Sequence, residues 1–148
     1  MRALGVDLGT VRIGLALSDP DKVIASPHDI LPAGDVDADD WPHQTAAAIA
    51  QVARACDADT IVVGLPRSLA GRETPGASAA RRVAAALREI GGLTVELWDE
   101  RLSSVEAERM LISAGQRRAA RRTARDRVAA AIILQAWLQD RARRRTED

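Results

Sequence analysis

The sequence predicts an α/β fold with a mixed five-stranded sheet, in which an antiparallel β-meander is followed by parallel strands, and helices flank the sheet. Two observations predict this class. The first eighteen residues are apolar and interrupted by glycines, which is typical of a hairpin. Later apolar runs, at 60–65 and 94–98, alternate with segments whose apolar residues recur at helical spacing. Alternation of strands and helices favours parallel pairing with helices covering the faces.

The meander is expected to comprise the hairpin of residues 1–18, with a tight turn near Gly9, and a short third strand at 22–26. The residues between them, 19–21, have the composition of a turn. Residues 27–40 contain proline, glycine and several aspartates, so we expect a surface loop there.

The aspartates of this loop do not form a calcium-binding motif. Asp40 stands where the calcium loop needs glycine, and Ala46 stands where it needs a bidentate glutamate. An acidic, solvated loop is the better interpretation.

The remaining elements follow from periodicity and from start and stop signals. Ser103 and Glu106 form a capping box, and Gly115 ends the helix that they begin. Residues 116–125 carry five arginines and almost nothing apolar, so we expect a mobile segment. The predicted elements are helices at 45–56, 78–90, 103–115 and 123–143 and strands at 60–65 and 94–98.

The length and composition bound the class of protein. A chain of 148 residues is expected to form one domain, 1–148, with a flexible charged tail at 141–148. No apolar run reaches the roughly 20 residues that span a bilayer, and no signal-peptide pattern is present, which predicts a cytoplasmic protein away from membranes. The single cysteine, Cys56, excludes a disulfide framework. With three tryptophans and no other aromatic residue, binding of single strands by stacking is disfavoured.

The net charge of zero conceals an asymmetry. Through Pro66 the chain has four basic and ten acidic residues, whereas from Arg67 onward it has seventeen and eleven. The later basic residues are all arginine, which binds phosphate through a planar, weakly hydrated fork. A codon bias toward arginine explains part of this composition, so the position of each arginine matters more than the number.

Asp7 lies inside the first predicted strand, where a carboxylate loses its hydration and needs a cation, a metal or several hydrogen bonds. One interpretation is that it only satisfies turn amides beside Gly9. The other is that it belongs to a functional site, in which case Gly5, Gly9 and Gly14 let the turn and a nucleic-acid backbone approach it.

Two further acidic residues support a functional site. Glu100 lies just beyond the end of a strand, where open sheets place their ligands. Asp126 heads an otherwise apolar stripe of the last helix that continues through Ala129, Ala130 and Ile133. Taken alone, Asp126 also fits a first-turn residue favoured by the helix dipole.

Three carboxylates from distant parts of the chain suit a hard divalent cation, Mg²⁺ or Mn²⁺, with water and phosphate completing its shell. Metals held in this way can activate a water and stabilise the leaving oxygen of a phosphodiester. Asp7, Glu100 and Asp126 are therefore the candidate catalytic and metal-binding residues, and the arginines near Asp126 are candidates for holding a phosphate backbone.

Four stretches of the chain form an ordered series of motifs. They are Gly5-Val6-Asp7-Leu8-Gly9-Thr10-Val11-Arg12-Ile13-Gly14-Leu15-Ala16, Val63-Gly64-Leu65-Pro66, Trp98-Asp99-Glu100-Arg101-Leu102-Ser103 and Arg125-Asp126-Arg127-Val128-Ala129-Ala130. They resemble the successive motifs of the YqgF-type bacterial proteins. That family is provisionally described as pre-16S rRNA nucleases and elsewhere as Holliday junction resolvases.

The resemblance implies a ribonuclease H-like fold and a divalent-metal nuclease with Asp7, Glu100 and Asp126 at the acidic positions. It also implies a role in 5′-end maturation of the small-subunit rRNA precursor, in the cytoplasm. Two stretches depart from the family pattern, since residues 67–71 are more basic and residues 35–41 more acidic than expected. The arginines expected to contact nucleic acid are Arg12, Arg67, Arg101, Arg117, Arg118, Arg121, Arg122 and Arg125.

Other interpretations remain open. The stretch around Asp7 also resembles the first phosphate loop of the actin and Hsp70-like ATPases, but those proteins need two such halves and this chain has one. A P-loop is excluded because Leu15 and Ala16 replace the required lysine and hydroxyl residue. A Holliday junction resolvase and a non-catalytic RNA-binding assembly factor are the alternatives to the rRNA nuclease. We expect a monomer or weak homodimer.

Overall fold

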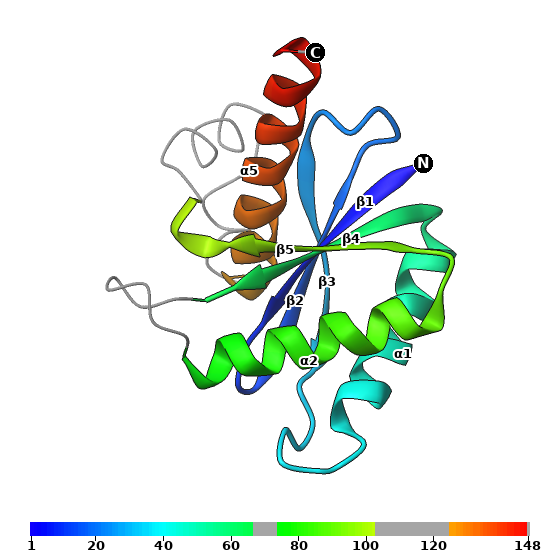
Figure 1. Cartoon of the computed structure of the whole chain (residues 1–148), viewed down its shortest axis with the longest axis vertical. Helices are drawn as coiled ribbons and strands as arrows, with labels where there is room; N and C mark the ends of the chain where they lie inside the picture. The colour runs from blue at the N-terminus through cyan, green and yellow to red at the C-terminus, as the bar shows by residue number, and fades with distance from the viewer. Residues whose placement is uncertain (67–73, 103–124, 148) are drawn as a thin grey trace.

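The computed structural model describes residues 1–66, 74–102 and 125–147, and its centre is the predicted mixed five-stranded sheet. The spatial order is β3-β2-β1-β4-β5. Strands β1, β2 and β3 pair antiparallel as a meander, whereas β1, β4 and β5 pair parallel (Figure 1). The strands span β1 (Arg2–Leu8), β2 (Arg12–Ser18), β3 (Ala25–Pro32), β4 (Ala58–Leu65) and β5 (Thr94–Asp99).

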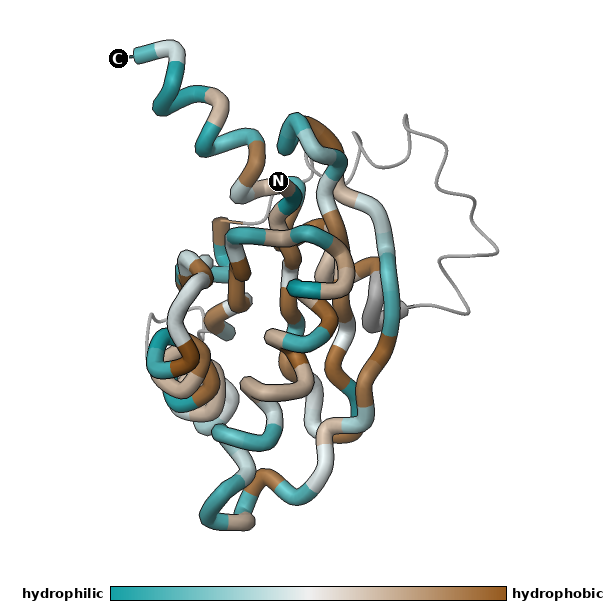
Figure 2. The backbone as a smooth tube through the Cα atoms, turned by 90° about the vertical axis from the view of Figure 1, so that its right-hand side faces the viewer, coloured by the Kyte–Doolittle hydropathy of each residue, from teal (hydrophilic) through white to brown (hydrophobic). Residues whose placement is uncertain are grey.

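Helices cover both faces of this sheet. Helices α1 (Trp41–Ala55) and α2 (Pro75–Ile90) pack on one face, and α5 (Arg125–Glu147) packs on the other (Figure 1). A short 3-10 helix, η1 (Glu100–Leu102), follows β5 directly. The tube in Figure 2 shows hydrophobic residues recurring along the strands. The sheet therefore separates two apolar cores.

The third strand was predicted too early and too short. It spans Ala25–Pro32, so it shares residues 25–26 with the predicted strand and continues through residues 27–32 of the expected surface loop. The chain turns for longer than expected because the Asp19 carboxylate accepts hydrogen bonds from the amides of Val23 and Ile24, at 2.7 and 2.8 Å. Strand β3 is an edge strand with mixed exposure along its length, so its polar residues resemble a loop in sequence.

Helices α1 and α2 both begin before their predicted starts. Helix α1 begins at Trp41 and not at residue 45, and the Trp41 indole donates to the Ala33 carbonyl at 2.6 Å. Helix α2 begins at Pro75, three residues before the predicted start at 78, because the Thr74 hydroxyl accepts from the Ala77 amide at 3.2 Å and caps it.

The structure tests the remaining sequence predictions only in part. Helix α5 continues to Glu147, so the expected flexible tail at 141–148 is helical through that residue. The predicted helix at 103–115 and the predicted mobile segment 116–125 lie outside the described residues, except for Arg125, which begins α5. Within the described ranges, no helix combines the length and the hydropathy needed to cross a membrane.

Helix α5 lies very close to the sheet at Gly5. A Cβ atom at this position would be 2.8 Å from Leu134 Cβ and 3.0 Å from the Ala130 carbonyl oxygen. Gly5 is buried beneath the helix, so the expectation that it lets a nucleic-acid backbone approach Asp7 is wrong. Its lack of a side chain instead lets α5 pack against β1.

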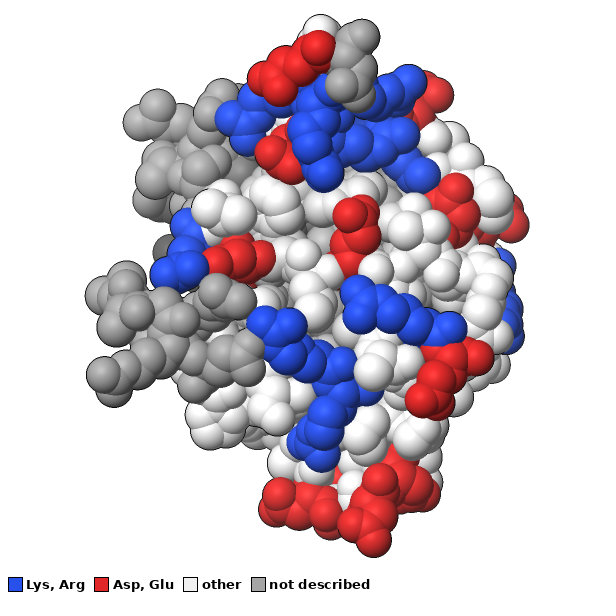
Figure 3. All heavy atoms as spheres, viewed as in Figure 1, with Lys and Arg blue, Asp and Glu red and all other residues white. Residues whose placement is uncertain are grey.

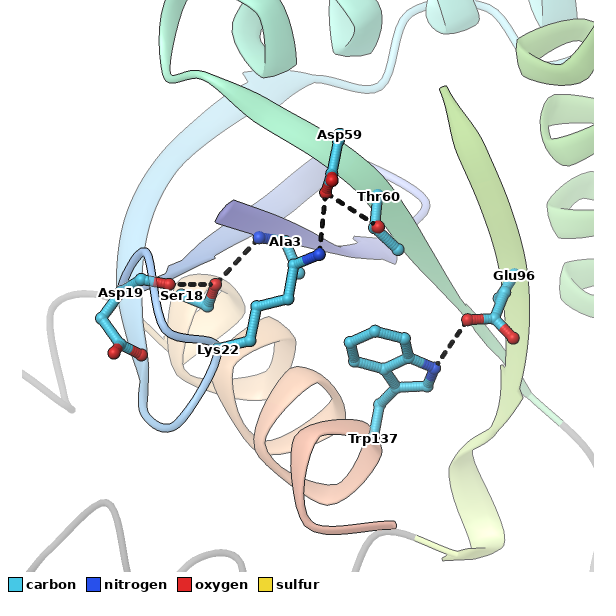
Figure 4. Close-up of polar contacts among 8 residues, drawn as sticks. All are labelled: Ala3, Ser18, Asp19, Lys22, Asp59, Thr60, Glu96 and Trp137. Carbon is cyan, nitrogen blue, oxygen red and sulfur yellow. Dashed lines mark hydrogen bonds and ion pairs between the residues drawn. The ribbon is translucent and has the colours of Figure 1, made fainter. Parts of the chain in front are cut away.

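Polar contacts join neighbouring strands of the sheet to each other and join α5 to the sheet (Figure 4). The Trp137 indole donates to Glu96 Oε2 at 3.1 Å, joining α5 to β5. The Ser18 hydroxyl accepts from the Ala3 amide at 2.8 Å, joining β2 to β1. The first contact fixes the middle of α5 against β5, and the second fixes the pairing of the two strands beneath that helix.

Candidate active site

Asp7 is placed by the two-residue period of β1. Ala3 belongs to the core beneath α5, and Gly5 contacts Leu134, so the alternate position Asp7 also lies on the α5 face. Its register partner on β2 is Gly14, which leaves no side chain opposite the carboxylate. Asp7 is partly buried.

Glu100 reaches the same face from the β5 edge of the sheet, two strands away from β1. It is the first residue of η1, directly after β5. Glu96 and Trp98, on the alternate positions before it, face α5, since Glu96 bonds Trp137 and Trp98 packs on the same core. Glu100 is partly buried as well.

The two carboxyl groups meet across β4. The pKa of Glu100 is raised from its ordinary value of 4.5 to about 7, first by burial, then by the negative charge of Asp7, a side-chain hydrogen bond with Asp7 and the charge of Asp99. Two carboxylates this close cannot both ionise readily without a cation. Near neutral pH the pair therefore retains a proton, or it binds a positive charge.

The pair opens into a cavity of about 210 Å³. Ala129, Ile132 and Ile133 of α5 line it together with Asp7 and Glu100. The polar groups among these side chains are carboxylates only, which are the oxygen ligands that Mg²⁺ and Mn²⁺ prefer. The donor chemistry and the mutual repulsion of the pair fit a hard divalent cation.

Asp126 lies in the first turn of α5, and its side chain is outside the described structure. It precedes Ala129 by three residues and Ile133 by seven, so helical periodicity puts the three positions on one face. Ala129 and Ile133 both line the cavity. Among the described residues, no group of three or more His, Cys, Asp or Glu side chains is placed to hold a metal.

The predicted arginines divide into three groups. Arg12 is exposed at the start of β2, at the sheet end where β1 terminates. Arg101 is engaged by Asp99, to which it donates from Nη2 at 2.7 Å and from Nε at 3.1 Å. Arg125 begins α5 with its side chain not described, and those outside the described residues are Arg67, Arg117, Arg118, Arg121 and Arg122.

The described surface is electrostatically uneven. Basic side chains gather at the C-terminal end of α5, and acidic side chains gather at the opposite pole of the view (Figure 3). The acidic residues of the loop before α1 are all exposed, as the sequence predicted for them; they are Asp35, Asp37, Asp39 and Asp40.

Sequence reasoning missed the role of Gly64. This residue lies in β4 between the two carboxylates, and a Cβ there would be 2.8 Å from Glu100 Oε1. A signal was present, because a glycine inside an apolar strand indicates close approach of another group. It did not reveal which group.

The family model and the sequence relatives that match this chain are described as resolvases or nucleases. A family model described as RuvX, Holliday junction resolvase, matches residues 1–140. Two proteins provisionally named pre-16S rRNA nuclease are similar along nearly the whole chain. The one from Pelotomaculum thermopropionicum is 41% identical over 99% of this chain and 92% of its own. The one from Geobacillus kaustophilus is 44% identical over 95% and 99%.

Solved structures share the fold at low sequence identity. Thermus thermophilus RuvC matches with a TM-score of 0.60 and 14% identity over 96% of both chains. The fowlpox virus Holliday junction resolvase matches with a TM-score of 0.56 and 13% identity, over 95% of this chain and 99% of its own. These matches confirm the predicted ribonuclease H-like fold.

A ROK hexokinase from Thermus thermophilus matches with a TM-score of 0.52 and 22% identity. The match covers 73% of this chain but 38% of the kinase. This chain thus shares its fold with part of a larger kinase.

Proposed function

Because the chain belongs to the RuvX family of Holliday junction resolvases, we propose that it is a divalent-metal-dependent nuclease with Asp7, Glu100 and Asp126 as its catalytic and metal-binding residues. The family membership confirms the resemblance drawn from the four sequence motifs, and with it the expectation of a nuclease. The metal, the site residues and the substrate are the proposed part.

The observation that carries this proposal is the meeting of Asp7 and Glu100 in one cavity. A structural role for Asp7 limited to turn amides leaves the second carboxylate unexplained, because placing two acids together destabilises the fold unless a proton or a cation separates them. The position of Asp126, one turn before Ala129 of the cavity wall, supports a third ligand.

Each residue has a defined task in this proposal. Asp7 and Glu100 would hold the cation with Asp126, and Ile132 and Ile133 form an apolar wall beside it. When bound, the cation supplies the Lewis acidity that activates water and offsets the charge of the phosphate. Arg12, at the same sheet end, contributes a positive charge for the phosphate backbone.

The favoured substrate is the precursor of small-subunit rRNA, because the relatives similar over the whole chain are named for it. A bacterial rRNA precursor is matured in the cytoplasm, so we propose that location. The alternative substrate is a four-way DNA junction, which the description of the family favours. A monomer or weak homodimer remains our prediction.

The test offers the purified protein an rRNA precursor and a four-way DNA junction side by side, with Mg²⁺, with Mn²⁺ and with chelator. The variants Asp7→Asn and Asp126→Asn are compared with Asp21→Asn. Asp21 is an exposed acid in the turn between β2 and β3, at the opposite end of the sheet, which makes it a matched control.

We expect metal-dependent cleavage that the two site variants lose and the control retains. Undiminished cleavage in Asp7→Asn would disprove the proposed site. If neither the wild type nor any variant cleaves, but Asp7→Asn still supports growth of a cell depleted of the native protein, the protein is a non-catalytic assembly factor. Preferential cleavage of the junction would select the resolvase activity.

A further inference from the structure

Gly64 occupies the position over which Glu100 must pass to reach Asp7. Strand β4 lies between β1 and β5, with Val63 in register with Val6 and Gly64 in register with Trp98. Val62, two residues earlier, packs on the core beneath α5, so position 64 faces the same side.

A side chain at position 64 would collide with two groups. Its Cβ would be 2.8 Å from Glu100 Oε1 and 2.8 Å from Ile133 Cδ1, closer than the 3.0 Å below which real Cβ atoms are essentially never found. The Glu100 Cγ atom would be 3.4 Å away. One contact thus involves the carboxylate of the site, and the other involves the helix that forms the cavity wall.

The backbone at this position does not itself require glycine. Among the described residues, the glycines with positive φ are Gly34, Gly91 and Gly92. Gly64 is not one of them and lies within the regular pairing of β4 with β5. The space that a Cβ would fill is therefore the reason for glycine here.

We propose that Gly64 is a positioning residue: its missing side chain lets the Glu100 carboxylate cross β4 and meet Asp7, and so sets the spacing of the two ligands of a divalent cation. This inference rests on the proposed function. It adds the requirement that position 64 of β4 has no side chain. This requirement can prove wrong even if Asp7 and Glu100 do bind the metal.

Packing of α5 alone gives a competing explanation, because Ile133 also contacts the empty position. Two second-site changes separate the explanations. Glu100→Asp shortens the acid and removes its contact, whereas Ile133→Val removes the Cδ1 atom and leaves the acid unchanged. Each is combined with Gly64→Ala.

The experiment measures Mn²⁺ binding by calorimetric titration of the full chain, without nucleic acid, together with circular dichroism. We expect Gly64→Ala to remain folded and to weaken Mn²⁺ binding about tenfold or more. In a Glu100→Asp background, whose own affinity is measured first, Gly64→Ala weakens Mn²⁺ binding less than it does in the wild type. The combination with Ile133→Val stays as weak as Gly64→Ala.

Three results would overturn the inference. The first is wild-type Mn²⁺ affinity in Gly64→Ala. The second is a loss of affinity on Gly64→Ala that Ile133→Val abolishes and that is undiminished in the Glu100→Asp background. The third is an unfolded Gly64→Ala protein, since a flexible carboxylate would have moved aside. Failure of the proposed function is distinguishable from these. In that case Asp7→Asn binds Mn²⁺ as tightly as the wild type, whatever Gly64→Ala does.

Discussion

Replacing Glu100 by glutamine tests the energetic consequence of bringing two acids together. In the unfolded chain the Glu100 carboxyl loses its proton near the ordinary pKa of 4.5, whereas in the folded protein burial and Asp7 raise the pKa to about 7. The stabilising effect of the bound proton is therefore complete below pH 4.5 and is lost as the pH rises to about 7. Glu100→Gln removes this dependence.

The size of the effect follows from the pKa. A rise from 4.5 to about 7 corresponds to about 3 kcal/mol of differential stability. Glu100 is only partly buried, so solvent screening reduces the expected effect to about 1 to 2 kcal/mol. In the metal-free protein at pH 8, Glu100→Gln should thus be more stable than the wild type by this amount.

The assay is urea unfolding followed by tryptophan fluorescence between pH 4.5 and 8, with chelator present. The difference in free energy of unfolding between wild type and variant cancels the other ionisable groups, including Asp19 and Asp59, whose pKa values are lowered in the fold. Glu147→Gln, at an exposed position near the end of α5, is the matched control. Parallel pH profiles for wild type and Glu100→Gln would refute the reasoning.

Two further predictions concern stability and substrate binding. Gln135 is fully buried, and its Oε1 accepts from the Ala25 amide at 2.8 Å while Nε2 donates to the Val23 carbonyl at 3.2 Å. Gln135→Leu leaves the Ala25 amide and the Val23 carbonyl without these partners. The substitution should therefore lower the free energy of unfolding by about 2 kcal/mol. Replacing four of the five arginines of 116–125 by glutamine should reduce the slope of nucleic-acid affinity against salt concentration, both on logarithmic scales, by about 3. The four residues are Arg117, Arg118, Arg121 and Arg122.

The measurements for these two predictions are direct. Urea unfolding of Gln135→Leu is compared with that of Gln139→Leu, one turn further along α5 and partly exposed; equal losses would contradict the role of the buried amide. Affinity of the arginine variant is measured at several salt concentrations, and a slope equal to that of the wild type would show that these residues do not contact the backbone.

Local pattern was sufficient for most of the architecture. Continuous apolar runs predicted β4 and β5, and the stripe below Asp126 predicted the face of α5 that packs on the sheet, since burial imposes the period of each element on its residues. The bounds of strand β3 were mispredicted because an edge strand is buried less and carries polar residues. The start of α1 was missed because its first contact, from Trp41 to Ala33, crosses a loop.

The sequence by itself determined that Asp7 lies in the first strand and that Glu100 lies just beyond the end of another. Only the tertiary structure decided that they meet, because their contact depends on parallel pairing of β1, β4 and β5, which brings together residues far apart in the chain. The tertiary structure also shows why position 64 is glycine, because the Glu100 carboxylate lies against this position. A glycine in a strand shows that space is needed, and the fold alone shows which group uses that space.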